Sequence, residues 1–436
     1  MTFTYADLFA GIGGFHAALD ELGGECVYAS EIDQFAAAVY EKNWGRNPLG
    51  DITQDVNDES MNVPECDLLS AGFPCQPFSK SGAQRGMEET RGTLYWHILQ
   101  ILHSRKPSMV VLENVRNLAG PRHHDDWMTI IKTLRDAGYH VSDQPAVFSP
   151  HLLPPEQGGT PQIRERVFIC ATHLTHRRNP GRAANLRESQ PEPPVTPVPI
   201  DGWDPQRWSL KRHLLSARNS SSKSCQLKSE EVLWIDAWDD FVKMMLELRD
   251  GRRLPGFPLW SDSWKRSLSI PTDAPKWKVD FLTKNRDFYK ENRAEIDGWL
   301  NKWEVRSDRF PPSRRKLEWQ AQDSKSLWET LIQFRPSGIR VKRPTYVPAL
   351  VAISQTSIYG PERRRLSVRE AARLQGFKSN FDFGDQPDSQ SFKQLGNGVS
   401  IGAVKHVIRQ HALRDREILE KTNPGLLKSI LESKSR

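Results

Sequence analysis

Short apolar runs alternate with amphipathic stretches over the first 172 residues of the chain. The apolar runs predict strands at Thr4–Phe9, Cys26–Ser30, Asp67–Ser70, Met109–Glu113, His140–Val147 and Arg166–Ala171. Between them, residues 15–22 and 127–137 carry apolar side chains at helical spacing, and Gly23 and Gly138 stand where helix C-caps are expected. Because strands that alternate with helices are typical of βαβ units, this pattern predicts a doubly wound α/β domain with a mainly parallel sheet.

The alternation stops after Thr172. Residues 176–199 are rich in proline and arginine and predict a linker or an irregular loop. The stretch that follows, as far as about residue 345, holds eleven of the fourteen tryptophans beside many Arg and Lys residues, which favours a folded module with a polar ligand. Short α/β patterns return at Tyr346. We therefore predict one domain made of residues 1–172 and 346–436, interrupted by a smaller module at 173–345, with a peripheral helix or a frayed end over 414–436.

Charge separates the two parts of the chain. The formal net charge is +7, but residues 172–345 alone hold 33 Lys and Arg against 23 Asp and Glu. The basic surplus therefore belongs to the inserted module, where it indicates a polyanionic partner. Five scattered cysteines suggest neither a disulfide framework nor a zinc site, and no apolar run is long enough to span a membrane. These features predict a soluble protein of the reducing cytoplasm.

Two features point to a cofactor that contains a nucleoside. Residues 7–15, Asp-Leu-Phe-Ala-Gly-Ile-Gly-Gly-Phe, follow the first predicted strand and open the first helix, where a glycine-rich turn lets a cofactor approach the backbone. Glu31 ends the second predicted strand, where a carboxylate can accept hydrogen bonds from both hydroxyls of a ribose. A tight turn beside an unrelated acid explains the same residues.

Four side chains form a candidate catalytic set. Cys75 lies in Gly-Phe-Pro-Cys-Gln-Pro-Phe-Ser, after an apolar strand, and Glu113 ends a buried strand at the same edge of the sheet. Flanking prolines restrict the backbone around Cys75, as a nucleophile requires, although a cysteine is more often an inert buried residue. Burial would raise the pKa of Glu113, unless it is a helix cap or a salt-bridged acid. Arg164 and Arg166 alternate at strand spacing, and they either hold an anion or carbonyl or are simply solvated.

The order of nine short blocks is more specific than any single motif. DLFAGIGGF, SEID, GDIT, GFPCQPFS, RGTL, ENV, QIRER, REAARLQGF and QLGNGVS stand in one series over residues 4–170 and 345–405. This series closely resembles that of bacterial DNA (cytosine-5) methyltransferases. The resemblance implies an α/β, Rossmann-like S-adenosylmethionine-dependent methyltransferase fold. It also implies that the module between QIRER and REAARLQGF is a target-recognition domain.

The resemblance assigns a cofactor set. Phe9 would stack on the adenine of S-adenosylmethionine, Glu31 would bind the ribose and Asp51 would accept from the adenine amino group. The backbone at Gly11 and Gly13 would border the methionine part. Pro74 and Asn397 complete the implied set, and no metal is needed.

The resemblance also implies the chemistry. Cys75 would add to C6 of a cytosine flipped out of duplex DNA, while Glu113 would give a proton or hydrogen bond to N3. Arg164 and Arg166 would contact the base carbonyl and position the reacting groups. Ser81 would contact the gap left by the base, and the Gly- and Ser-containing loop around Ser81 and Gln84 would close over the DNA.

The basic module would contact phosphates and read base edges. Its densest basic patch comprises Arg309, Arg314, Arg315 and Lys316, although such runs are usually just solvated faces. The implied setting is a monomer in the bacterial cytoplasm, associated with the nucleoid in use, that protects host DNA beside a separate restriction endonuclease. The sequence leaves the recognition sequence undetermined.

Three other functions stay open on the residues. A dinucleotide-dependent oxidoreductase would use the same glycine-rich opening, but it leaves GFPCQPFS, ENV and the basic module unexplained. A catalytically silent DNA-binding relative is disfavoured by the intact catalytic set. Methyl transfer to RNA cytosine or protein is weakened only by the basic module.

Overall fold

The computed structural model describes residues 2–74, 93–176, 179–183, 190–215, 225–270, 273–350 and 356–433. The chain forms two compact units. The first contains residues 1–208, 348–354 and 371–436, and the second contains residues 209–347 and 355–370. Helix α11 (Val368–Gln375) crosses the boundary along the chain.

A seven-stranded sheet forms the centre of the first unit, in the order β2-β1-β3-β4-β8-β5, with β6 also paired to β8. Strands β1 (Phe3–Leu8), β2 (Gly24–Ser30), β3 (Leu68–Gly72) and β4 (Met109–Val115) run parallel to one another. Strand β8 (Arg166–His173) is antiparallel to β4, and β5 (Tyr139–Val141) and β6 (Ala146–Phe148) are antiparallel to β8. The sheet is mainly parallel, as predicted.

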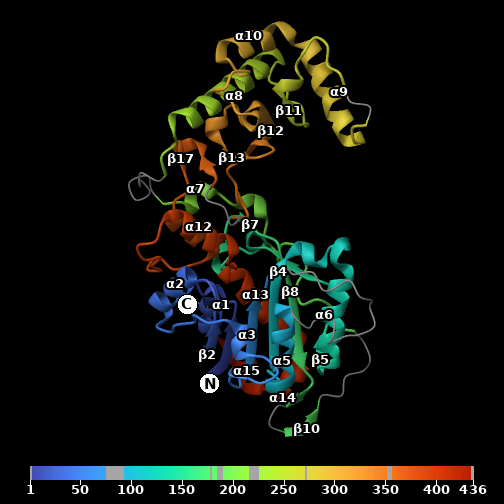
Figure 1. The fold of residues 1–436 in the computed structure, drawn as a ribbon, viewed down its shortest axis with the longest axis vertical. Helices are drawn as coiled ribbons and strands as arrows, with labels where there is room; N and C mark the ends of the chain where they lie inside the picture. The colour runs from blue at the N-terminus through green and yellow to red at the C-terminus, as the bar shows by residue number, and fades with distance from the viewer. Residues whose placement is uncertain are drawn as a thin grey trace. The chain divides into compact units, whose positions relative to one another are not determined.

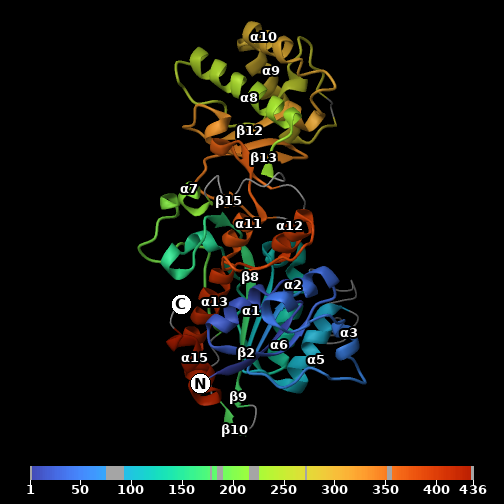
Figure 2. The ribbon, with the colours of Figure 1, turned by 90° about the vertical axis from the view of Figure 1, so that its left-hand side faces the viewer.

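Helices cover both faces of this sheet (Figures 1 and 2). Helices α3 (Ile52–Asp55), α5 (Leu94–Arg105) and α6 (His124–Asp136) share an apolar core with one face. Helices α1 (Gly14–Glu21), α13 (Ile401–Arg414), α14 (Arg416–Thr422) and α15 (Pro424–Glu432) lie on the other face, and α2 (Gln34–Trp44) and α12 (Asp388–Asn397) flank the carboxyl edge. This is the predicted doubly wound arrangement.

One predicted strand is wrong as a single element. The run His140–Val147 forms two strands, β5 and β6, because Ser142 accepts a hydrogen bond from the Gln144 backbone at 3.0 Å and turns the chain. The other predicted strands and both predicted helices are confirmed to within a few residues. Gly23 and Gly138 adopt φ of 88° and 87° just beyond α1 and α6, as C-capping glycines do.

The predicted domain boundaries at 173 and 346 differ from those of the units. Residues 190–208 belong to the first unit because the indoles of Trp203 and Trp208 both donate to the His151 carbonyl, at 3.0 and 2.9 Å. Residues 355–370 belong to the second unit because β16 (Ile358–Tyr359) and β17 (Arg364–Arg365) extend its sheet. Short strands β7 (Gln162–Ile163), β9 (Thr175–His176), β10 (Asn179–Ala183) and β15 (Val347–Pro348) lie outside the two main sheets.

The second unit is a six-stranded sheet with helices. The strand order is β11-β12-β14-β13-β16-β17, with β11 at Leu259–Trp260, β12 at Lys316–Gln320, β13 at Leu331–Arg335 and β14 at Gly338–Lys342. The helices are α7 (Leu210–His213), α8 (Ser229–Leu248), α9 (Lys276–Glu291) and α10 (Arg293–Trp303). Trp238, Trp264 and Trp299 are fully buried at its centre. Most tryptophans of the second unit therefore belong to its hydrophobic core.

The C-terminal tail is an ordered part of the first unit. Leu426, Leu427 and Ile430 of α15 are buried, and the Asn423 amide donates to Asp67 and Ser108 at 3.0 and 3.1 Å. The tail is therefore helical and docked over residues 416–432. No helix in the described ranges is both long and apolar enough to cross a membrane.

Candidate cofactor and catalytic site

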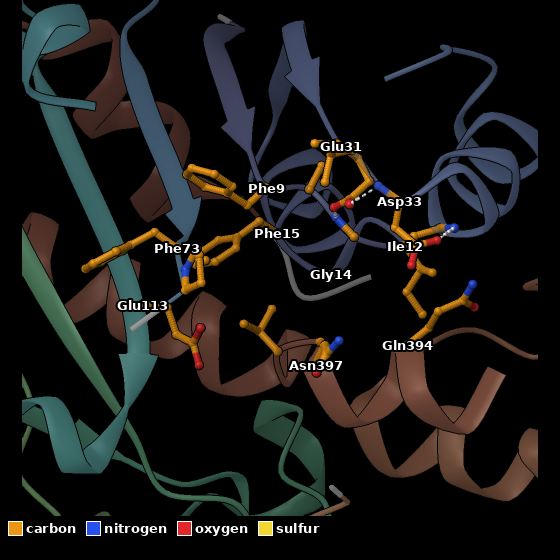
Figure 3. A pocket seen from close by; sticks show the side chains of 18 of the residues that line it. Phe9, Ile12, Gly14, Phe15, Glu31, Asp33, Phe73, Glu113, Gln394 and Asn397 are labelled. Carbon is orange, nitrogen blue, oxygen red and sulfur yellow. Dashed lines mark hydrogen bonds between the residues drawn. The ribbon is translucent and has the colours of Figure 1, made fainter. Parts of the chain in front are cut away.

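A pocket of about 490 Å³ opens at the carboxyl edge of the first sheet. Its walls come from the segments that follow β1, β2, β3 and β4 and from the end of α12. Figure 3 shows the rings of Phe9, Phe15 and Phe73 along one wall, with Glu31 and Glu113 at separate ends. Because parallel strands place their ligands at this edge, the pocket is the default site of the domain.

The glycine-rich turn bends sharply above β1. Phe9, Gly11 and Gly13 all have positive φ, at 56°, 57° and 86°. Left-handed backbone is unusual for phenylalanine and is retained where the surrounding structure enforces it, often at binding sites. Phe9 and Gly11 line the pocket, and a Cβ at Gly11 would meet nothing within 4 Å. Gly13 is buried and is not part of the pocket lining. It lies against Trp44, whose ring a Cβ at position 13 would overlap.

Glu31 is held in one orientation by two backbone groups. Its Oε2 accepts from the Gly11 N–H and its Oε1 from the Asp33 N–H, both at 2.8 Å. Burial raises the pKa of this carboxyl, and the two N–H donors act in the opposite direction. Each oxygen can accept a further hydrogen bond, so Glu31 remains able to bind a ligand.

Asp51 lines the same pocket but also serves as a helix cap. Its Oδ1 accepts from the backbone and hydroxyl of Thr53 at 2.9 and 2.8 Å, which begins α3. The cap fixes the carboxylate at the pocket wall. A capping role and a ligand-binding role are therefore compatible for this residue.

The described residues that precede Cys75 lie at the pocket wall. Phe73 and Pro74 line the pocket, and the buried Asn114 amide donates to the Phe73 carbonyl at 2.8 Å. Cys75 follows Pro74 directly in the chain, but it lies outside the described residues, as do Ser81 and Gln84. The Asn114 amide thus holds the backbone at Phe73, two residues before the predicted nucleophile.

Glu113 is buried at the end of β4 and faces a cation. Its side chain lies 2.9 Å from Arg166 Nε, and both residues line the pocket. Burial raises the pKa of Glu113, and the charges of Arg166 and Arg164 partly oppose that shift. A carboxyl under these two influences can hold a proton that it shares with a polar ligand.

Arg164 has a different set of contacts from Arg166. It lies between β7 and β8, is only 1% exposed and does not line the pocket. Its guanidinium donates to the carbonyls of Gly396, Gly398 and Leu350, at 2.7, 2.5 and 2.8 Å. Burial lowers the pKa of Arg164 to about 9. The side chain therefore fixes the end of α12, where Asn397 lines the pocket.

Comparison with known proteins assigns the chain to a protein family. The model of the C-5 cytosine-specific DNA methylase family matches residues 3–412. The chain belongs to this family. It is 47% identical to the type II methyltransferase M.AluI of Cellulosimicrobium cellulans, across 97% of this chain and 94% of that protein. It is 29% identical to the type II methyltransferase M.BanI of Aneurinibacillus aneurinilyticus, across 94% and 95%. A solved DNMT2 variant of Spodoptera frugiperda aligns over 94% of this chain and 99% of its own, with 16% identity and a TM-score of 0.47.

Membership confirms the predicted fold class and enzyme class. The protein is a DNA (cytosine-5) methyltransferase, and the oxidoreductase alternative is excluded. The family uses S-adenosylmethionine as the methyl donor. In the described part of the chain, no group of three or more His, Cys, Asp or Glu side chains could hold a metal ion.

Most side chains of the predicted basic patch contact other residues of the second unit of the methylase. Arg314 stacks over Phe334 at 4.5 Å and donates to the Arg335 carbonyl, while Arg315 donates to the carbonyls of Phe310 and Ser307. Arg309 is exposed and pairs with Glu304, and Lys316 lies over the Trp260 ring at 5.4 Å. Arg309 and Lys316 thus have the fewest competing contacts within the patch.

Sequence reasoning missed the role of Asn114. This residue belongs to the ENV block, but only Glu113 was assigned a role in it. An amide directly after a candidate acid, at the end of a buried strand, is the signal that could have identified it, because a buried amide needs hydrogen-bond partners. The contact with Phe73, 41 residues away in the chain, required the structure.

Proposed function

We propose that the carboxyl-edge pocket binds S-adenosylmethionine and that the adjoining Cys75 loop delivers the nucleophile to a flipped cytosine. The convergence of Glu31, Glu113 and the Pro74 end of the Cys75 loop on one pocket carries this proposal. The pocket would hold the cofactor through Phe9, Gly11, Glu31, Asp51, Pro74 and Asn397. Gly13 would act from outside the pocket, by allowing the turn to form.

The pocket residues fit this cofactor by chemistry. Aromatic rings at Phe9, Phe15 and Phe73 suit an adenine and a sulfonium methyl group. The carboxylates of Glu31, Asp33 and Asp51 suit hydroxyl and amino donors and a ligand that carries positive charge. The volume of about 490 Å³ lies within the range of small-molecule sites.

The chain's own groups would activate the base. Bound S-adenosylmethionine supplies an electrophilic methyl group. The thiolate of Cys75 would form a bond to C6 of cytosine, which places electron density at C5 for attack on that methyl group. Glu113 would donate a proton or hydrogen bond to N3 as negative charge develops in the ring. Loss of the C5 proton, with departure of the thiolate from C6, would restore the aromatic base.

The two arginines would have separate tasks. Arg166 would hold Glu113 in place and contact the base carbonyl, because it pairs with Glu113 inside the pocket. Arg164 would be a positioning residue that fixes the segment at Asn397, since its donors are taken by backbone carbonyls. Ser81 would contact the gap left by the flipped base, and the loop around Ser81 and Gln84 would close over the DNA.

Glu31 gives a direct test of cofactor binding. We expect Glu31→Ala to raise the Kd for S-adenosylmethionine about tenfold or more, because it removes charge-assisted hydrogen bonds and frees the Gly11 turn. Isothermal titration calorimetry measures this change. The matched control is Glu59→Ala, an exposed glutamate in the same unit, which should leave Kd unchanged. Equal affinity of Glu31→Ala and wild type would refute the assignment of the pocket.

The second unit would act as the target-recognition domain, in place of the predicted range 173–345. Its excess of basic residues supports contact with the DNA backbone. The further setting we propose is a monomeric enzyme of the bacterial cytoplasm that acts on host DNA beside a separate restriction endonuclease.

The salt dependence of DNA binding tests the patch in the second unit. We expect the double variant Arg309→Ala and Lys316→Ala to reduce the slope of log K against log salt by about 2, or about 1 for each lost phosphate contact. Fluorescence anisotropy at several salt concentrations measures the slope. Lys421→Ala, which changes an exposed lysine of the first unit, is the control and should leave it unchanged. An unaltered slope in the double variant would remove these residues from the interface.

A further inference from the structure

The glycine-rich turn is supported from the side away from the pocket by one tryptophan. The Trp44 indole N–H donates to the Ile12 carbonyl at 3.2 Å. Ile12 lines the pocket, whereas Trp44 does not. The ring also occupies the space that a side chain at position 13 would need. Trp44 therefore fixes both a hydrogen-bonding group and the shape of the turn.

Trp44 is itself held by a network of buried polar rings. The His16 ring stacks on Trp44, with centroids 4.5 Å apart. His16 Nδ1 lies 2.6 Å from the Tyr40 hydroxyl, and His16 Nε2 lies 3.2 Å from Asp20. The glycine-rich turn leads directly into α1, and α2 carries Tyr40 and Trp44. These contacts therefore join α1 to α2. The indole has little freedom to leave its place.

Helix α2 consequently touches the cofactor site at both of its ends. At the first end, the N–H of Asp33, its N-cap, donates to Glu31. At the other end, Trp44, its last residue, donates to Ile12. Glu31 in turn accepts from Gly11. The helix, the carboxylate and the turn form a closed ring of contacts around residues 11–12.

We infer that Trp44 is a positioning residue for the methyl donor, which holds the glycine-rich turn in its binding conformation without touching the ligand. This inference rests on the proposed assignment of the pocket to S-adenosylmethionine. The turn has positive φ at Phe9, Gly11 and Gly13, and its backbone hydrogen bonds run from the Ala10 N–H to the Ser30 carbonyl and from the Gly13 N–H to the Ala10 carbonyl, both at 2.9 Å. Support from outside preserves its shape before the ligand arrives, and a preformed site binds more tightly.

The test uses the conservative variant Trp44→Phe, which keeps an aromatic ring for His16 but removes the indole donor. We expect Kd and KM for S-adenosylmethionine to rise about five- to tenfold, with kcat at saturation and Kd for DNA changed less than about twofold. Trp127→Phe is the matched control, because its indole also donates to a backbone carbonyl, that of Asp143 at 2.8 Å, within the same unit. It should leave Kd for S-adenosylmethionine unchanged.

A second pair of variants tests the shape of the turn. Gly13→Ala should weaken S-adenosylmethionine binding more than Gly202→Ala, because both glycines have strongly positive φ but only position 13 meets Trp44. Unchanged affinity in Trp44→Phe, or a loss of affinity matched by losses of DNA binding and melting temperature, would overturn the inference. If Glu31→Ala also leaves affinity unchanged, the assignment of the pocket fails as well. If Glu31→Ala alone weakens binding, only the role of Trp44 fails.

Discussion

Replacing Cys75 with serine should lower methyl transfer to DNA by on the order of a thousandfold or more, because a serine hydroxyl is hardly ionised at neutral pH and adds poorly to C6. Binding of S-adenosylmethionine should be retained, since the substitution exchanges one sulfur atom for oxygen and leaves pocket-lining groups such as Glu31 and Asp51 unchanged. The experiment incubates protein with tritium-labelled S-adenosylmethionine and mixed-sequence duplex DNA and identifies the labelled base. Wild-type enzyme should give 5-methylcytosine, and the positions of the label would reveal the recognition sequence.

The matched control is Cys26→Ser, a free and partly exposed cysteine of the same unit that is not part of the pocket lining. It should retain nearly all activity. Equal label in wild type and Cys75→Ser would show that another group is the nucleophile. Label on a base other than cytosine would contradict the chemistry as a whole.

Glu113→Gln should lower kcat by about a hundredfold to ten-thousandfold, because glutamine can donate a hydrogen bond to N3 but cannot transfer a proton. The Kd for S-adenosylmethionine should change little, since Glu31 lies at a separate end of the pocket (Figure 3). Single-turnover kinetics with saturating cofactor and DNA measures the chemical step. Glu165→Gln is the control: it removes the same charge next to Arg166, but its carboxylate pairs with Arg116 at the surface.

The pH dependence of stability provides a second measurement on Glu113. Burial raises its pKa above the ordinary value of 4.5, so the native state binds this proton more tightly than the unfolded chain does. The stabilisation from the bound proton is present at low pH and is lost as the pH rises from about 4.5 through the pKa of the folded state. The melting temperature of Glu113→Gln relative to wild type should therefore increase with pH. A difference that is constant with pH would contradict the raised pKa.

Local patterns in the sequence predicted most of the first unit. Apolar runs marked its strands because a buried parallel strand is apolar on both faces. Gly23 and Gly138 marked helix ends because only glycine adopts positive φ without strain. The failure at His140–Val147 was also local, since a side-chain hydrogen bond of Ser142 divided one apolar run into two strands. The bounds of the two compact units differ from the predicted domain boundaries because the contacts that set them, such as those of Trp203 and Trp208 with His151, join distant parts of the chain.

The sequence by itself determined the fold class, the family and the residue types of the site, because these follow from periodicity and from an ordered series of motifs. Only the tertiary structure decided how the residues are used. It separated Arg166, paired with Glu113 in the pocket, from Arg164, bound to the carbonyls beside Asn397. It also brought Trp44 against Ile12, a contact that no motif contains. The physical reason is that hydrogen bonds to buried carbonyls depend on which chain segments fold together, whereas strand and helix periodicity depends only on neighbours in sequence.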